Sequence, residues 1–276
     1  MKWIVATFFL PILSLAQVVP AHSPNDKTEL QLTTFLKTED DGVLPSTTRV
    51  MKFIDRLDAN PESYAKHQQS FVRQIFVKTH SRFLRAFKPN ATFSQLFSNG
   101  NYNCLTATAL IGTTLQHFGY SFRIFETNHH IFILVNTDRG TTLLETTDPF
   151  TGFITDPKIV EEKISAYKSA TASKPDSRVI QFEFQTRVFR EVTLENITGL
   201  LHFNHSVSAY NRKDFEESTR HLEEASKYYQ SSRLIEFTDV VLLTIRELQP
   251  RDASSLSARL QKLRKASSET LASTKF

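Results

Sequence analysis

A single cysteine, Cys104, lies where a polar loop gives way to an apolar run in the 276-residue chain. Cysteine is nucleophilic as the thiolate, and the first turn of a helix that begins at Cys104 would favour that anion. Two histidines, His129 and His130, follow at the start of an apolar, strand-like run. An imidazole beside the sulfur would complete an ion pair and carry protons. These residue types therefore predict nucleophilic acyl transfer.

An imidazole used in this way is held in one tautomer by a third group, usually a carboxylate. Glu145 and Asp148 are the two candidate acids, on or just past the strand expected to pair with the one after His130. Side chains alternate between the faces of a strand, so the length of the turn decides between them. A four-residue turn at residues 137–140 puts His130 on the face of Glu145, and a three- or five-residue turn puts it on the face of Asp148. The sequence leaves both alternatives open.

Acyl transfer also needs donors that stabilise the oxyanion. The backbone amide of Cys104 is the natural first donor, and Asn103 is a candidate for the second. Asn before a helix is equally expected as a cap residue. One cysteine and two adjacent histidines match no standard zinc spacing, so we expect neither a metal site nor a cofactor.

The segments that must position these side chains are helices and antiparallel strands. Apolar residues recur at three- and four-residue spacing between residues 64 and 87, which predicts one helix. A second helix is expected at residues 104–117, with Gly119 as its stop. Alternating patterns predict strands at residues 120–124, 131–135, 141–146 and 180–188, and residues 130–147 are expected to form a hairpin. Helix followed by antiparallel strands is typical of the α+β class.

Three short motifs carry a family resemblance: Cys104 at a helix start, His-Ile-Phe at residues 130–132, and Leu-Glu-Thr at residues 144–146. In this order they resemble the core of the transglutaminase-like superfamily of papain-like cysteine enzymes. Residues 103–119 and 126–145 also resemble bacterial exported transglutaminase-like proteins of uncharacterised activity. The resemblance covers about residues 68–155, under half of the chain. It implies a papain-like fold, with a helix packed on an antiparallel sheet.

The resemblance also implies a triad of Cys104, His130 and an acid, with His130 and not His129 as the base. Glu145 stands where family members usually carry Asp, and Phe132 stands where they commonly carry Trp. The implied activity is cleavage of a peptide or amide bond in a protein or peptide substrate, rather than crosslinking. A non-catalytic binding or assembly protein with the same fold is the alternative, which the two replacements favour.

The organisation along the chain is expected to have five parts. Residues 1–16 read as a signal peptide, with Lys2, an apolar run and a small-residue cleavage site, which predicts export to the periplasm or outside the cell. Elsewhere no apolar run is long enough to span a bilayer. The remaining parts are an N-terminal extension at 17–62 with one short helix at 50–57, the transglutaminase-like domain at 63–190, a helical region at 191–250, and a tail at 251–276.

The C-terminal third is expected to be helical from Thr193 onward. Residues 209–229 resemble one tetratricopeptide-type hairpin, with the small residues Ser218 and Ala225 at its close approach. An ordinary helical hairpin packed on the preceding domain fits the pattern equally well. The repeat alternative implies a protein partner on these helices.

The overall composition is that of an ordinary globular protein. Hydrophobic residues make up 40% of the chain, and 33 basic and 29 acidic residues give a net charge of +4. The charges are interspersed, without the basic patch that a nucleic-acid partner requires.

Overall fold

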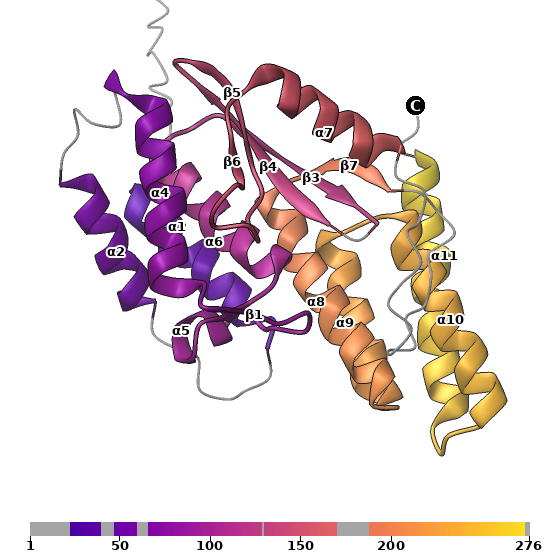
Figure 1. The fold of residues 1–276 in the computed structure, drawn as a ribbon. Helices are drawn as coiled ribbons and strands as arrows, with labels where there is room; N and C mark the ends of the chain where they lie inside the picture. Colours follow the sequence, from indigo (N-terminus) through magenta and orange to yellow (C-terminus); the bar gives the residue numbers. More distant parts are fainter. Residues whose placement is uncertain (1–22, 40–46, 60–65, 129, 170–187, 274–276) are drawn as a thin grey trace, which may run out of the picture.

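The computed structural model describes residues 23–39, 47–59, 66–128, 130–169 and 188–273, and its chain is traced in Figure 1. The helices are α1 (Pro24–Leu36), α2 (Thr48–Asp58), α4 (Gln68–Phe83), α5 (Gln95–Ser98), α6 (Cys104–His117), α7 (Pro157–Ser169), α8 (Leu194–Asn211), α9 (Phe215–Tyr228), α10 (Ser232–Leu248) and α11 (Ala253–Ser273). The strands are β1 (Ala86–Phe87), β2 (Asn101–Tyr102), β3 (Phe122–Thr127), β4 (Ile131–Thr137), β5 (Gly140–Leu144), β6 (Phe153–Ile154) and β7 (Phe189–Val192). The α+β prediction is confirmed.

The main sheet has five antiparallel strands in the order β6-β5-β4-β3-β7, and β1 and β2 form a separate parallel pair. In the β4–β5 hairpin Asn136 pairs with Thr141 and Thr137 with Gly140. This is the register of the four-residue turn, one of the two alternatives that the sequence left open. It places the side chains at positions 130 and 145 on one face of the sheet.

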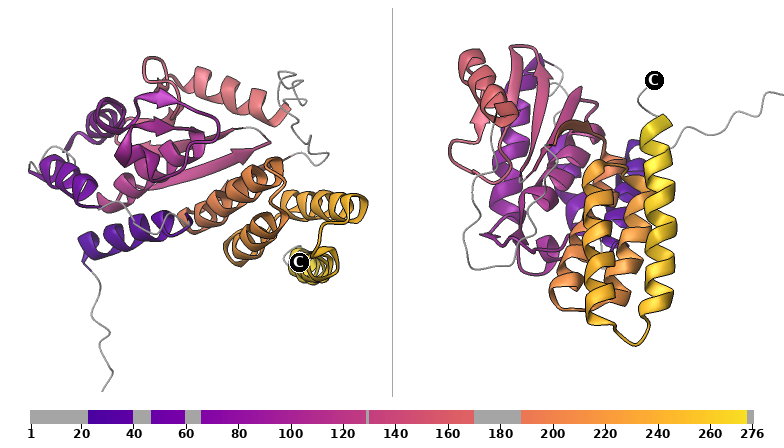
Figure 2. Two further views of the ribbon diagram at one scale, coloured as in Figure 1. Left: turned by 90° about the horizontal axis from the view of Figure 1, so that it is seen from below. Right: turned by 90° about the vertical axis from the view of Figure 1, so that its right-hand side faces the viewer.

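The two faces of the sheet are covered by different helices, as the views in Figures 1 and 2 show. Ile131, Ile133 and Val135 of β4 point into the large core that α6 shares with α1, α4 and α8. Phe132, with Phe125 and Leu143 of the neighbouring strands, forms a second, smaller core under α7. The alternation along β4 therefore separates the two layers.

Helix α6 occupies the centre of the larger core. Asn103 caps it: the side chain accepts a hydrogen bond from the Thr106 amide, and the Thr106 hydroxyl accepts one from the Asn103 amide. Every residue from 105 to 115 is buried. Such continuous burial explains why the helix is apolar on all sides rather than along one stripe. At its far end Gly119 has a φ of +70°, a backbone conformation that favours glycine.

The N-terminal extension is more ordered than the sequence analysis predicted. The expected short helix is present as α2, but residues 24–36 form a further helix, α1, which was not predicted. Ser23 and Asp26 make a capping box at its start. Leu32, Phe35 and Leu36 are almost completely buried, and α1 packs against α6. Residues 24–36 are thus part of the core.

The C-terminal helices α8 to α11 run side by side, as the right-hand view of Figure 2 shows. The predicted hairpin is the α8–α9 pair, which approaches closely at Gly199, where a Cβ atom would lie 2.4 Å from Tyr229 Cβ. Residues 253–273, in the tail of a region expected to be helical from Thr193 onward, form helix α11. Its Leu256, Leu260 and Leu263 are buried against α9 and α10.

Some predictions fall outside the described residues. They include the signal peptide at 1–16, His129 and nearly all of the strand expected at 180–188, next to which β7 begins at Phe189. Within the described part of the chain, no helix combines the length and the hydropathy that crossing a membrane requires.

Candidate active site

The three residues with the predicted chemistry meet at one end of the main sheet. Cys104 is the first residue of α6, His130 immediately precedes β4, and Glu145 directly follows β5. Because β4 and β5 are antiparallel, the start of one and the end of the other lie together. The single cysteine is unpaired and partly exposed.

The His130 imidazole contacts both of its predicted partners. Its Nε2 is hydrogen-bonded to Glu145 Oε2 in a partly buried ion pair. The Cys104 side chain is its second partner, and their interaction contributes to the raised pKa of His130. Since Nε2 is engaged by the carboxylate, Nδ1 is the ring nitrogen left for the sulfur. The order sulfur, imidazole, carboxylate is that of a nucleophile, a base and the group that orients the base.

The electrostatics of the pair favour charge on both groups. Burial by itself would lower the pKa of His130, but its hydrogen bonds to Cys104 and Glu145, with their charges, raise that pKa to about 9. Burial likewise disfavours the Glu145 carboxylate, yet His130, Tyr167 and Lys163 lower its pKa below the usual value. At neutral pH the site therefore holds an imidazolium facing a carboxylate.

A hydroxyl group that the sequence analysis did not identify completes the carboxylate's partners. Tyr167 of α7 donates its phenolic hydrogen to Glu145 Oε1, and its ring stacks on Phe132 at 4.9 Å between centroids. The same ring lies 5.6 Å from the His130 ring. Helix α7 thus closes the site from the face opposite to α6. Nothing in the local sequence around Tyr167 indicates this role, which depends on how α7 folds over the sheet.

The residue after Glu145 ties the strand end to the nucleophile's helix. Thr146 Oγ1 donates to the Cys104 carbonyl at 3.3 Å and lies 3.0 Å from Thr108 Oγ1. On the other side, His80 Nε2 of α4 lies 3.1 Å from the Thr146 carbonyl oxygen. Thr146 belongs to the motif quoted above, whereas His80 was not identified as a site residue.

A glycine shapes the loop that follows the acid. The Glu145 amide donates to the Gly152 carbonyl at 2.8 Å, and the Gly152 amide donates to the Asp148 carbonyl at 3.1 Å. A Cβ atom at position 152 would lie 2.4 Å from the carbonyl oxygen of Glu145 and 2.3 Å from that of Asp148. Only glycine fits without a shift of the backbone that carries the acid.

Two sequence candidates have other roles. Asp148 does not contact His130 but accepts hydrogen bonds from the Phe150 and Thr151 amides and from the Thr151 hydroxyl, so it stabilises its own loop. The Asn103 side chain donates to the carbonyl groups of Pro89 and Ala91, which occupies both of its N–H bonds. Of the two candidate acids, Glu145 is therefore the one that contacts His130, and the Asn103 side chain caps α6 with both of its N–H bonds engaged.

The backbone amide of Cys104 keeps its predicted place in the first turn of α6, where amides lack intrahelical acceptors. Among the described residues, no three or more His, Cys, Asp or Glu side chains are arranged to hold a metal ion.

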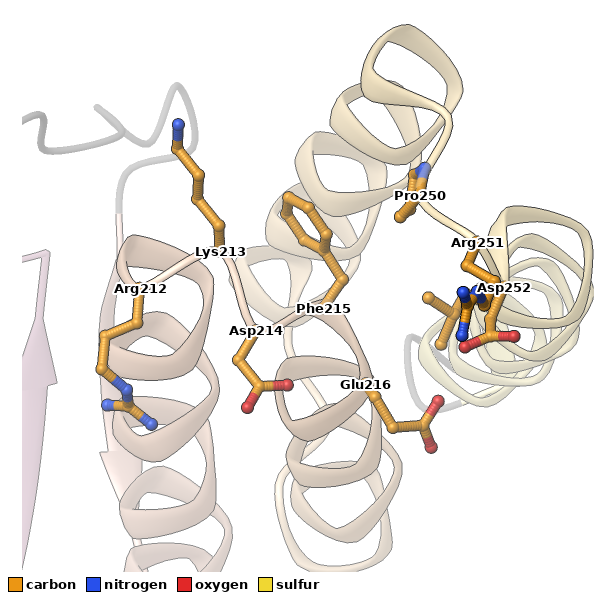
Figure 3. A pocket seen from close by; sticks show the side chains of 9 residues that line it. Arg212, Lys213, Asp214, Phe215, Glu216, Pro250, Arg251 and Asp252 are labelled. Atoms are coloured by element: carbon orange, nitrogen blue, oxygen red, sulfur yellow. The ribbon is translucent and has the colours of Figure 1, made fainter.

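Of the hollows outside the triad, two adjoin the C-terminal helices. One, of about 430 Å³, adjoins Asn103 and is lined mainly by polar groups from residues 89–92 and α8, including Asn90, Asn204 and Asn211. The other, of about 350 Å³, lies between the α8–α9 and α10–α11 turns (Figure 3). Its lining carries charges of both signs.

No protein-family model matches the chain, and no curated protein or solved structure is significantly similar to it. Its function must be inferred from its own residues.

Proposed function

We propose that the protein is an exported cysteine hydrolase or acyltransferase with a papain-like, transglutaminase-like core, which cleaves a peptide or amide bond. One arrangement carries this proposal: Cys104 begins α6 at the end of the sheet where His130 pairs with the buried Glu145 carboxylate, and the hydrogen bond and charge of the sulfur contribute to the raised pKa of His130. Perturbed pKa values of a contacting His and Glu pair beside a possible nucleophile are typical of catalytic sites.

The residues support a two-step reaction. The Cys104 sulfur attacks the carbonyl carbon of the amide, and His130 gives its proton to the departing amine, which leaves a thioester on the sulfur. The Cys104 backbone amide donates to the oxyanion that forms between these steps. His130 then takes a proton from water or from an acceptor amine, which attacks the thioester and regenerates the sulfur. Glu145 fixes the ring and stabilises the imidazolium throughout.

The hollow beside Asn103 favours peptides over apolar substrates. The carboxamides of Asn90, Asn204 and Asn211, with Ser208 and Thr92, offer both donors and acceptors of hydrogen bonds. A peptide backbone presents the matching groups, one N–H and one C=O for each residue. We therefore expect the bonds cleaved to lie in peptides.

Alkylation kinetics test the triad without knowledge of the substrate. Iodoacetamide should modify Cys104 at pH 6 at least about tenfold faster than it modifies a free thiol, because the imidazolium stabilises the reacting anion. The variant His130→Ala should lose this advantage, and His67→Ala, which removes an exposed histidine at the start of α4, should keep it. A wild-type rate equal to that of a free thiol, or one that His130→Ala leaves unchanged, refutes the triad.

Acylation tests the reaction itself. Short peptide amides are incubated with the protein, and an acyl adduct on Cys104 is sought by mass spectrometry after acid quenching. We expect the adduct in the wild type and its absence in Cys104→Ser. Fast alkylation without any adduct or peptide cleavage would instead favour the non-catalytic binding protein.

Export is tested separately, by sequencing the N-terminus of the protein recovered from outside the cytoplasm. We expect a chain that begins at Gln17. Recovery of the full-length chain from the cytoplasm alone contradicts export and leaves the triad untouched.

A further inference from the structure

The turn that presents His130 is held from two directions. Within the turn, the Thr127 amide donates to the His130 carbonyl at 2.8 Å, and the His130 amide donates to Thr127 Oγ1 at 3.0 Å. From outside, Arg233 near the start of α10 donates to the Asn128 carbonyl at 2.9 Å. The Arg233 side chain, from the C-terminal helices, thus binds the backbone two residues before His130.

The same guanidinium is anchored on the strand that leads into the turn. Arg233 Nη1 donates at 3.0 Å to Oε1 of Glu126 in β3, and this Glu126 side chain is only 3% exposed. Tyr229 donates its hydroxyl to the same oxygen at 2.7 Å, and Arg190 lies 3.7 Å from the other oxygen. A buried charge with these partners fixes geometry, since each partner is costly to move.

The planar guanidinium spans two acceptors that lie on opposite sides of one residue, Thr127. Its two terminal nitrogens reach the Glu126 carboxylate and the Asn128 carbonyl at once. Lysine, with a single ammonium group on a flexible chain, cannot reproduce this fork. Arginine at this position therefore sets the orientation of the turn and not merely its charge.

We propose that Arg233 is a positioning residue for His130, so that the C-terminal helices help to align the base with the sulfur. This inference rests on the proposed function. It assigns to α10 a task beyond covering the core or docking a partner. Arg233 acts through the backbone of the turn and does not touch the reacting atoms. Displacements of about 1 Å at a reacting group are enough to lower rates by up to about a hundredfold.

The experiment compares Arg233→Met with Arg233→Lys and with Arg259→Met. Arg259 is the matched control, because it joins α11 to Glu216 and Glu223 of α9, away from the turn. Two quantities are measured on each full-length protein: the pKa of His130, from its NMR titration, and the pH profile of Cys104 alkylation by iodoacetamide. Should Arg233→Met not fold, the double variant E126Q/R233M, which also removes the buried carboxylate, takes its place.

The direction of the pKa change separates positioning from simple electrostatics. Loss of a nearby positive charge can only raise the pKa of a histidine. A displaced ring instead loses its contacts with Glu145 and Cys104, so its pKa falls. For Arg233→Met we expect a fall of about one unit or more, a tenfold change in proton affinity. Alkylation at pH 7 should slow about tenfold.

The controls complete the test. Arg233→Lys should give an intermediate result and Arg259→Met the wild-type result. If the pKa of His130 in Arg233→Met rises or stays unchanged, the inference is overturned while the triad stands. If wild-type His130 titrates normally and Cys104 reacts like a free thiol, the proposed function itself fails.

Discussion

Replacement of Glu145 by glutamine tests the site through protein stability, without a substrate. The glutamine side chain has nearly the same size, but it lacks the charge and has only one carbonyl oxygen. In the wild type, His130 donates to one carboxylate oxygen and Tyr167 to the other. Glutamine can accept only one of these bonds and must turn its NH2 group toward the other donor. The variant therefore loses both the ion pair and one hydrogen bond.

The magnitude follows from the pKa of His130. That pKa is about 9 in the folded protein against a usual value of 6.5, so the folded state binds the proton more tightly. Tighter proton binding by the folded state adds to the free energy of unfolding. This added stability is fully present below pH 6.5 and is lost as the pH rises through about 9. Linkage gives a loss of about 3 kcal/mol between pH 6 and pH 9. Cys104 and Glu145 both raise this pKa, so Glu145→Gln should remove the share of the pH dependence that Glu145 supplies. The difference in stability between the variant and the wild type should therefore be widest near pH 6 and should narrow toward pH 9.

Urea unfolding at several pH values between 6 and 9 measures the effect. The matched control is Glu161→Gln, a charge removed from an exposed position on α7. Its curve should run parallel to that of the wild type. If the gap between Glu145→Gln and the wild type stays constant across this range, His130 does not draw its affinity for the proton from Glu145, and the assignment of the acid is wrong.

Three further predictions concern neighbouring groups. Tyr167→Phe keeps the stacked ring but leaves the Glu145 carboxylate without one donor, so urea unfolding at pH 7 should show a loss of about 1–2 kcal/mol, and an unchanged midpoint would contradict the bond. Gly152→Ala forces the backbone at Glu145 to move and should slow Cys104 alkylation about tenfold, whereas Gly119→Ala, with open space around its Cβ, should strain the backbone but leave the rate unaffected. Burial and positive neighbours lower the pKa of His221 to about 3, so acid protonates His221 in the unfolded chain before it does so in the folded protein. The free energy of unfolding should therefore fall by about 2 kcal/mol between pH 6.5 and pH 5. His221→Gln should flatten this slope, and an equal slope in both proteins would refute the role of His221.

The parts of the fold that sequence patterns predicted are those set by local rules. Helix α6 has a polar cap, a long apolar run and a glycine after its end, which are the ordinary signals of a helix. The β4–β5 hairpin has two apolar runs around a polar turn. Its register could not be predicted, because turns of three, four or five residues all fit the sequence between the strands.

The sequence analysis missed helix α1 and the surface that α11 covers, and both depend on contacts between distant segments. Helix α1 begins with a capping box at Ser23 and carries Leu32 and Leu36 on one face, but its many polar residues resemble a loop until α6 is available to cover that face. The apolar spacing of α11 is visible in the sequence, whereas the surface of α9 and α10 that it covers is not.

The residues of the candidate site likewise divide into those that the local sequence marks and those that depend on contacts between distant segments. Cys104, His130 and Glu145 were among the sequence candidates because their residue types and order mark them, and the fold brings them to one end of the sheet. Asp148 stayed a candidate because only the register excludes it. Tyr167 and Arg233 reach the site from helices remote in sequence, and no local pattern marks either residue.

The depth at which α6 is enclosed has a dynamic consequence for its first residue. Amide hydrogens of a helix buried on every side exchange with solvent only when much of the protein opens. We therefore expect the sulfur to be carried by a slowly exchanging helix, while the imidazole and the carboxylate are carried by a turn and a strand end. On warming, we expect misalignment to begin on the side of the base, so reactivity should fade at temperatures where the helix is still fully protected.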